Sequence, residues 1–454
     1  MTVQLPLYNE PNVAGRLIDA VAAMVYDGEV DIQVLDDSTD ETTEIVAARV
    51  ACWRARGVRI AHVRRATREG FKAGALAHGM ALSKAELFAV FDADFVPERE
   101  MLREVVPYFG TSSRLTVDGS HGTTRCHVNR ERSTVNGNIG MVQARWGHLN
   151  RTQSLLTRVQ AIYLDGHFAV ESAARHLGGR FFNFNGTAGI WRRQAIDDAG
   201  GWSSSTLTED LDLSYRAQLA GWDFVFLPHV EVPAELPSAL SGFQEQQHRW
   251  AKGSIQTARK ILPRIWRSDV PLAVKCEATF HLTNNSAYLL TVVIALLMVP
   301  AIAIRQRLGV TWSLLVDAAL FATSTGSVLL FYIEGQRLAG RPRPTLRELL
   351  CVLPVGIGIS IRNSAAVLEG LFEQGGYFRR TPKQGEASHA REERPPRIPV
   401  AELLLALFFA VALAGFLAAR QWISAPFLTL FLSGFGYVSW WALRERLSFM
   451  RSAT

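Results

Sequence analysis

The sequence has few cysteines, and they are not arranged as pairs. The four, Cys52, Cys126, Cys276 and Cys351, are spread over 454 residues without the spacing of a disulfide framework or a zinc site. A disulfide-stapled protein is therefore excluded, and a reducing compartment is the simpler environment. No signal peptide is expected, because Met1 leads directly into an apolar strand-like segment, "TVQLPLYNE".

A glycine-rich turn is missing after this first segment. Residues 8–15 read "YNEPNVAG", without the Gly-x-Gly-x-x-Gly turn that lets a backbone approach a dinucleotide, which argues against a nicotinamide-dependent dehydrogenase. Acids are scarce in the long apolar runs of the last third, where Asp317 alone lies well inside one, so a transporter with a polar pathway is disfavoured. The net charge is a modest +6, and nucleic acid is not among the expected partners.

Residues 1–240 alternate short strand-like and helical segments. The strand-like segments are "TVQLPLY", "DIQVLD", "VRIAHV" and "LFAVFD", and helix-period apolar residues occupy 12–27, 41–56 and 71–83. This alternation predicts an α/β domain with a mostly parallel sheet covered on both faces. Ligands of such sheets bind at the carboxyl ends of the strands, where the polar clusters at 9–10, 36–40 and 92–94 fall.

The last third contains four segments that approach the roughly 20 apolar residues needed to cross a bilayer. They are 289–304, 312–333, 399–419 and 422–443. A fifth segment, 346–372, carries Arg362, Asn363 and several glycines, so an interfacial or re-entrant helix is favoured over a lipid-exposed span. Most flanking arginines then lie on one side, and the positive-inside rule puts the first domain in the cytosol. We expect an integral protein of the cytoplasmic (plasma) membrane.

Two acidic pairs at predicted strand ends are candidates for ligand binding, and each has an ordinary alternative. Asp92 and Asp94 are two residues apart in an extended segment, so they point the same way and offer hard oxygens to Mg²⁺ or Mn²⁺. Taken alone, such a pair is more often a turn or a helix cap. Asp36 and Asp37 fit either a nucleoside site or a turn that begins a helix.

Three further stretches combine charge with a helix pattern. In "TEDLDLSYRAQLAGW" (208–222), Asp210 is either a proton acceptor for catalysis or an acid suited to a helix start capped by Thr208. Lys72 can pair with a phosphate, although a single lysine in a helix usually faces solvent. In "QEQQHRWAKG", Arg249 offers a planar fork for phosphate and Trp250 a flat face for a sugar or base, or both belong to a membrane-surface helix.

In this order, the motifs closely resemble the family 2 glycosyltransferases, and within them the membrane-embedded cellulose-synthase-like and glucomannan-synthase-like enzymes. The resemblance covers most of the chain and rests on "VQLPLYNE", "LDDSTD", "KAGAL", "FDADF", "GTAGIWR", "TEDLDLSYRAQLAGW", the Gln-x-x-Arg-Trp pattern at 246–250 and "FRRTPK". It implies a GT-A catalytic domain, which is a Rossmann-like nucleotide-sugar fold, followed by an α-helical transmembrane domain.

The expected organisation follows from this resemblance. A catalytic domain at 1–240 would be followed by interfacial helices at 241–280 and a transmembrane domain at 281–454. The polar stretch 110–139 would be a surface loop insertion, and 377–383 would match the gating loop of cellulose synthases.

The resemblance also implies roles for individual residues. Asp210 would be the general base, and Asp92 and Asp94 would hold the divalent metal. The nucleotide-sugar donor would be bound by Glu10, Asp36, Asp37, Lys72, Asp92, Gln246, Arg249, Trp250, Phe378, Thr381 and Lys383. The acceptor pocket would be lined by Asn185, Gly186 and Thr187.

The function that these expectations favour is an inverting transfer of a hexose from UDP-glucose or GDP-mannose to a growing β-linked polysaccharide. The alternative is a single transfer to a lipid acceptor, as in ceramide glucosyltransferase-like relatives. Membrane lipids are expected partners, and the sequence leaves accessory export subunits open.

Overall fold

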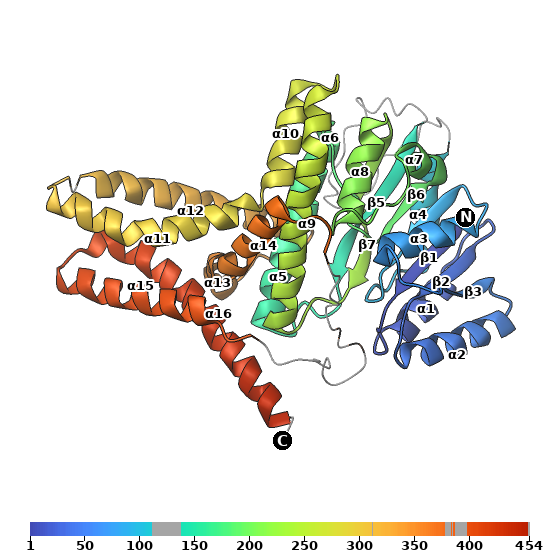
Figure 1. Ribbon diagram of the computed structural model, residues 1–454, viewed down its shortest axis with the longest axis horizontal. Helices are drawn as coiled ribbons and strands as arrows, with labels where there is room; N and C mark the ends of the chain where they lie inside the picture. The colour runs from blue at the N-terminus through green and yellow to red at the C-terminus, as the bar shows by residue number, and fades with distance from the viewer. Residues whose placement is uncertain (111–137, 311, 377–382, 384, 386–396, 453–454) are drawn as a thin grey trace.

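The computed structural model describes residues 1–110, 138–310, 312–376, 383, 385 and 397–452. A sheet with its covering helices forms one part, and a bundle of long helices forms the other (Figure 1). The expected insertion at 110–139 and the gating-loop-like segment at 377–383 lie almost entirely outside the described residues.

The sheet has seven strands in the order β3-β2-β1-β4-β6-β5-β7. They are β1 (Thr2–Leu7), β2 (Asp31–Asp36), β3 (Ile60–Arg64), β4 (Leu87–Val90), β5 (Ile139–His148), β6 (Gly189–Arg192) and β7 (Asp223–Ala234). Neighbours pair in parallel except β6, which runs antiparallel to β4 and β5. The central strand β1 is buried almost throughout, as expected of a parallel sheet covered on both faces. The predicted mostly parallel α/β fold is confirmed.

Helices cover both faces of the sheet and bury two separate apolar cores. The first core includes α1 (Ala14–Ala22), α2 (Thr42–Ala55) and α4 (Met101–Val105), which continues into the 3₁₀ turn η1 (Val106–Phe109). The second includes α3 (Phe71–Ala81), α7 (Arg193–Asp198) and α8 (Glu209–Leu219). Leu17 and Leu76 are fully buried in the first and second core.

The parallel register brings three loops to one edge of the sheet. Leu7 at the end of β1 pairs with Asp36 at the end of β2, and β4 lies on the other side of β1. The segments that carry Glu10, Asp37 and Asp92 therefore emerge side by side.

A layer of helices separates the sheet from the bundle. It contains α5 (Leu155–Gly166), the π-helical turn η3 (His167–Ser172), α6 (Ala173–Leu177), α9 (Leu240–Arg267) and α10 (Leu272–Thr283). In Figure 1, α9 and α10 run crosswise to α11, α12 and α15 and lie between them and the sheet. This arrangement is typical of helices at a membrane surface.

Four helices in the described part of the chain are long and apolar enough to cross a membrane. They comprise α11 (Ser286–Arg307), α12 (Ser313–Leu338), α15 (Val400–Ala418) and α16 (Ala425–Ser452), the last preceded by the 3₁₀ turn η4 (Trp422–Ser424). Their apolar side chains face outward, and Leu330 is 60% exposed, which suits lipid rather than water. These four match the expected spans.

The fifth apolar segment is broken in the middle. Helices α13 (Leu346–Gly358) and α14 (Ser360–Phe372) meet at a bend of 44°, which fits a broken span or a re-entrant loop. At the far end of the bundle, Asp317 on α12 pairs with Arg305 on α11, so the acid faces a neighbouring helix.

Candidate active site

A pocket opens at the carboxyl edge of the sheet, beside the start of α9. It brings together most of the residues that the sequence singled out: Glu10, Asp37, Lys72, Asp92, Asp94, Asn185, Gly186, Asp210, Gln246, Arg249, Trp250 and Lys383. Asp36 and Thr187 do not line it. Phe378 and Thr381 lie outside the described residues.

Asp36 and Asp37 face different surroundings because they straddle the end of β2. The buried Asp36 carboxylate pairs with His62 at 2.8 Å and accepts the Ser38 N–H at 2.9 Å. Burial would raise its pKa, but these hydrogen bonds lower it, so Asp36 is an ionised structural group. Asp37 turns to the pocket and accepts a hydrogen bond from Arg65 Nε at 3.0 Å.

Each of the two aspartates after β4 is paired with a lysine ammonium. Lys72 Nζ donates to Asp92 Oδ1 at 2.5 Å and to the Gly186 carbonyl at 3.0 Å. Lys383 Nζ donates to Asp94 Oδ2 and to the Glu235 carbonyl, both at 2.8 Å. The two carboxylates are thus neutralised by two cations that come from distant parts of the chain.

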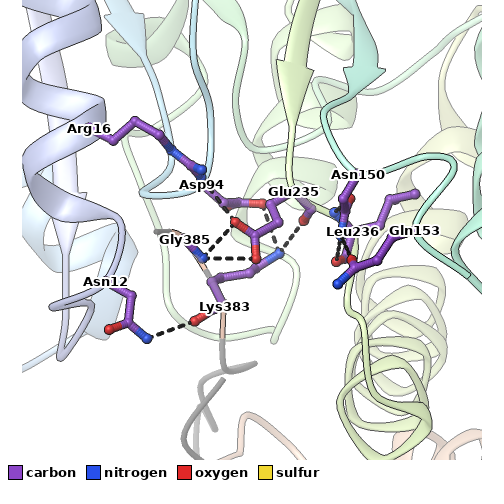
Figure 2. A network of polar contacts seen from close by, with 9 residues as sticks. All are labelled: Asn12, Arg16, Asp94, Asn150, Gln153, Glu235, Leu236, Lys383 and Gly385. Atoms are coloured by element: carbon purple, nitrogen blue, oxygen red, sulfur yellow. Dashed lines mark hydrogen bonds and ion pairs between the residues drawn. The ribbon is translucent and has the colours of Figure 1, made fainter. Parts of the chain in front are cut away.

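Figure 2 shows the polar contacts that hold Lys383 beside Asp94. The Glu235 carboxylate accepts the Gly385 N–H at 3.0 Å and pairs with Arg16 on α1 at 3.1 Å. Asn12 Nδ2 donates to the Lys383 carbonyl at 3.1 Å. These contacts fix the backbone on both sides of the Lys383 side chain.

The Asp92–Asp94 pair fits a divalent cation only with help from a ligand. Among the described residues, no group of three or more His, Cys, Asp or Glu side chains could hold a metal ion. Two carboxylates supply hard oxygens of the type that Mg²⁺ and Mn²⁺ prefer, and donor phosphates would supply others. The residues present therefore fit a cation that arrives with a phosphate ligand.

Asp210 lies deep in the same pocket, in the first turn of α8. Gly186 has φ +82°, and a Cβ at this glycine would lie 2.9 Å from Asp210 Oδ2 and 3.5 Å from Lys72 Nζ. The glycine is needed both for its backbone conformation and for this close approach. Burial and the negative charge of Glu209 raise the pKa of Asp210 to about 7, against the opposing effect of Lys72. A carboxyl with this pKa can accept a proton near neutral pH.

The acids on either side of Asp210 have separate roles. Glu209 lines the pocket, with Oε1 4.0 Å from Lys72 Nζ, so it is not simply a helix-start acid. Asp212 points away, is fully buried, and pairs with Arg216 and with Lys260 of α9 at 2.8 Å each. Thr208 takes the N-cap position, but its side chain makes no capping hydrogen bond.

Part of the pocket wall is aromatic. The rings of Trp250 and Trp146 have centroids 6.4 Å apart, and Trp146 packs edge-on against Phe95 at 5.3 Å. Trp146 and His148 are two apart on β5 and both line the pocket. Flat apolar faces of this kind suit sugar rings.

Several pocket residues were missed by reasoning from the sequence. Trp146 and His148 could have been found from strand alternation, because residues i and i+2 share a face. Tyr8 and Arg68 also line the pocket, with the guanidinium carbon 3.3 Å from the tyrosine ring centroid. The position of Glu235 after β7 carries no local signal.

Helix α9 packs against the turn that begins α8. A Cβ at Gly253 of α9 would lie 2.5 Å from the Thr208 side chain and 3.0 Å from its backbone nitrogen. Thr208 Oγ1 also lies 3.2 Å from Thr257 Oγ1. The helix that carries Arg249 and Trp250 is thereby fixed relative to Asp210.

Comparisons with known proteins show the family of the chain. Residues 1–253 match the model of the glycosyltransferase-like family 2. The match spans more than half of the chain, and the chain belongs to this family. The resemblance drawn from the motifs is confirmed.

The chain is also similar to curated plant proteins. It is 42% identical over 264 residues to a probable glucomannan 4-beta-mannosyltransferase 7 of Oryza sativa subsp. japonica, covering 57% of this chain and 41% of that protein. It is 33% identical over 380 residues to a glucomannan 4-beta-mannosyltransferase 1 of Cyamopsis tetragonoloba, covering 82% and 65%. The chain thus spans less than two thirds of the length of these relatives.

Among solved structures, the chain is similar to the mannosyltransferase PcManGT from Pyrobaculum calidifontis in complex with GDP-Man and Mn²⁺. The TM-score is 0.50 at 18% identity, and the likeness covers 82% of this chain and 86% of that one. At this identity the likeness concerns the fold, and the expected GT-A architecture is confirmed.

Proposed function

We propose that this protein is a membrane-anchored, inverting mannosyltransferase that moves a mannosyl group from GDP-mannose to a growing β-linked polysaccharide. The observation that carries the proposal is that Asp210, with a pKa of about 7, lines the same pocket as Asp92 and Asp94. The glucomannan 4-beta-mannosyltransferase names of the relatives, and the GDP-Man bound to the Pyrobaculum enzyme, favour GDP-mannose over UDP-glucose.

The proposed reaction is a single displacement at the anomeric carbon. The acceptor hydroxyl oxygen forms the new bond on one face while the bond to the nucleoside diphosphate breaks on the other. Asp210 would accept the hydroxyl proton during this attack. Lys72 and Arg249, both lining the pocket, would balance the negative charge that develops on the departing diphosphate.

Asp92 and Asp94 would hold Mg²⁺ or Mn²⁺ through their carboxylate oxygens. A divalent cation bound there would stabilise negative charge on the diphosphate. Trp250 and Trp146 would stack on the acceptor sugar, and Asn185 and Gly186 would line its path to Asp210. Glu10 and Asp37 would contact the nucleoside.

The proposed location is the cytoplasmic (plasma) membrane, with the sheet on the cytosolic side. The four candidate spans bring both ends of the bundle sequence back to the side of the sheet. Arg337, Arg341, Arg347, Arg444 and Arg446 would then lie on that side, in agreement with the positive-inside rule.

The test is a panel of nucleotide sugars with membranes that contain the protein. GDP-mannose, UDP-glucose and UDP-N-acetylglucosamine are each supplied with Mg²⁺, Mn²⁺ or a chelator, and release of the nucleoside diphosphate is measured. We expect release from GDP-mannose only, and its loss with the chelator. Release from UDP-glucose alone would contradict the assignment of the donor. Release unaffected by the chelator would contradict the metal.

The length of the product distinguishes a polysaccharide from a lipid acceptor. Radiolabel from GDP-mannose should elute from a sizing column as chains of many sugars that a β-mannanase digests. Label recovered only in the organic phase as a single sugar on lipid would favour the alternative transfer.

A further inference from the structure

A π-helical turn lies behind the pocket, between α5 and α6. Residues His167–Ser172 form this turn, η3, and both flanking segments are ordinary α-helix. Such single wide turns are rare and frequently occur at functional sites. Here the turn packs against α12 of the bundle, where a Cβ at Gly166 would lie 2.8 Å from the Phe331 ring.

The imidazole of His167 connects this turn to the pocket. Its Nε2 lies 3.2 Å from Asn185 Oδ1, and its Nδ1 lies 3.1 Å from Glu171 Oε2. Arg175 Nη1 approaches the same glutamate oxygen at 3.4 Å. Asn185 lines the pocket beside Gly186, where a Cβ would lie 2.9 Å from Asp210 Oδ2.

The hydrogen bonds of neighbouring groups determine which atom of the Asn185 carboxamide is the oxygen and which is the nitrogen. Asn183 Nδ2 lies 3.2 Å from the Phe184 carbonyl and 3.0 Å from Asn185 Oδ1. A carbonyl oxygen only accepts, so the Asn183 atom is the amino nitrogen, and the atom of Asn185 that it meets is the oxygen.

This oxygen fixes the protons of His167. Nε2 faces an accepting oxygen and must carry a hydrogen, and Nδ1 faces a carboxylate and must carry one too. The imidazole is therefore the doubly protonated cation, balanced by Glu171. Burial would raise the pKa of Glu171, but the hydrogen bond and charge of His167, together with Arg175, lower it to about 2.

The charge states of the other titratable groups near His167 are compatible with a positive charge on its imidazole. On α10, burial and the positive charges of Arg175 and His167 hold the pKa of His281 well below its usual value, so His281 is neutral. On the same helix, Glu277 Oε1 accepts a hydrogen bond from Arg175 Nε at 2.5 Å. The cation on His167 thus has one close counter-ion, Glu171.

The Asn185 Oδ1 atom accepts hydrogen bonds from His167 Nε2 and Asn183 Nδ2. The amino group of the same carboxamide therefore points away from these two donors. One hydrogen has a long contact with the Asn183 carbonyl at 3.5 Å. The other has no hydrogen-bond partner in the part of the chain that the structure describes. Asn185 and Asp210 line the same pocket, so this amide N–H is a candidate donor to a bound acceptor.

We propose that His167 and Glu171 are positioning residues that hold the Asn185 amino group toward the acceptor sugar. The inference rests on the proposed function and extends it. A hydroxyl that gives its hydrogen to Asp210 can only accept from other partners, so a fixed donor is complementary to it.

Three substitutions separate this role from a merely structural one. Glu171→Gln keeps an acceptor for Nδ1–H but removes the negative charge beside the imidazole. His167→Leu removes the donor to Asn185. His167→Gln supplies an amide N–H donor to Asn185 in place of the imidazole. His229→Gln, at an exposed site on β7, is the matched control.

The measurement is steady-state kinetics with GDP-mannose and β-1,4-mannohexaose as the acceptor. We expect Glu171→Gln and His167→Leu to raise KM for mannohexaose about tenfold and to leave KM for GDP-mannose within twofold. His167→Gln should stay within threefold of wild type.

Equal changes in both KM values, or His167→Gln as impaired as His167→Leu, would overturn the inference. An unchanged donor KM also shows that each variant is folded. No release of GDP by the wild type would instead overturn the proposed function, and the inference with it. The two failures are thus distinguishable.

Discussion

The ammonium of Lys383 lies 2.8 Å from the carboxylate of Asp94, in the position where a cation is expected to bind with the donor. Lys72 is paired with Asp92 in the same way. Before any ligand arrives, the two aspartates are therefore neutralised by the chain itself. A divalent cation that binds Asp94 would have to compete with Lys383.

We predict that Lys383→Met binds Mn²⁺ more tightly than wild type in the absence of nucleotide. Removal of a competing ammonium should tighten binding about tenfold, which corresponds to about 1.4 kcal/mol. Free Mn²⁺ is measured by electron paramagnetic resonance during titration. Lys84→Met, at an exposed site, should match wild type. Equal affinity of Lys383→Met and wild type would contradict the competition.

Asp210→Asn should abolish transfer without loss of donor binding. Loss of a general base slows the chemical step by about 10²–10⁴-fold. The substitution keeps the size of the side chain, so the dissociation constant for GDP-mannose, measured by calorimetry, should stay within twofold. Asp197→Asn on the exposed face of α7 should be fully active. Parallel loss of binding and turnover would argue against a catalytic role.

The pH dependence should report the raised pKa of Asp210. Because the base must be ionised, kcat/KM should fall tenfold per pH unit below about 7. The charge of Glu209 contributes to this raised pKa, so Glu209→Gln should move the acid limb to lower pH. A profile of kcat/KM from pH 5 to 9 tests both statements. A limb that stays in place or moves to higher pH would show that another group titrates.

Asp212→Asn, two residues further along the same helix, should affect stability instead. Its buried carboxylate neutralises Arg216 and Lys260, and breaking such a pair costs about 3–5 kcal/mol. Lys260 is partly exposed, so we expect the lower end of this range. The apparent Tm in detergent should fall by several degrees, whereas Asp197→Asn should not change it. An unchanged Tm would mean that the network contributes little.

Much of the sheet and its edge could be predicted because the signals are local. Strand–helix alternation predicted the strands from Thr2 to Val90, and the position of Asp92 and Asp94 after an apolar strand predicted their place at the carboxyl edge. The four apolar runs predicted the long helices, because bilayer thickness sets their length.

The parts of the candidate site that could not be predicted depend on contacts between segments far apart in the sequence. Asp36 and Asp37 look alike in sequence, and only the end of β2 turns one to His62 and the other to the pocket. The place of Glu209 in the pocket could not be predicted, because nothing nearby in the chain shows that Lys72 lies 4.0 Å away. The π-helical turn at His167 has no sequence signature of its own.

The contact of Gly253 with Thr208 has a practical consequence. Cutting the chain after residue 240 would keep every strand of the sheet. It would remove α9, which packs against the turn before Asp210 and supplies Arg249 and Trp250 to the pocket. We therefore expect such a fragment to lack transferase activity, because two residues of the pocket lie on the helix that is removed.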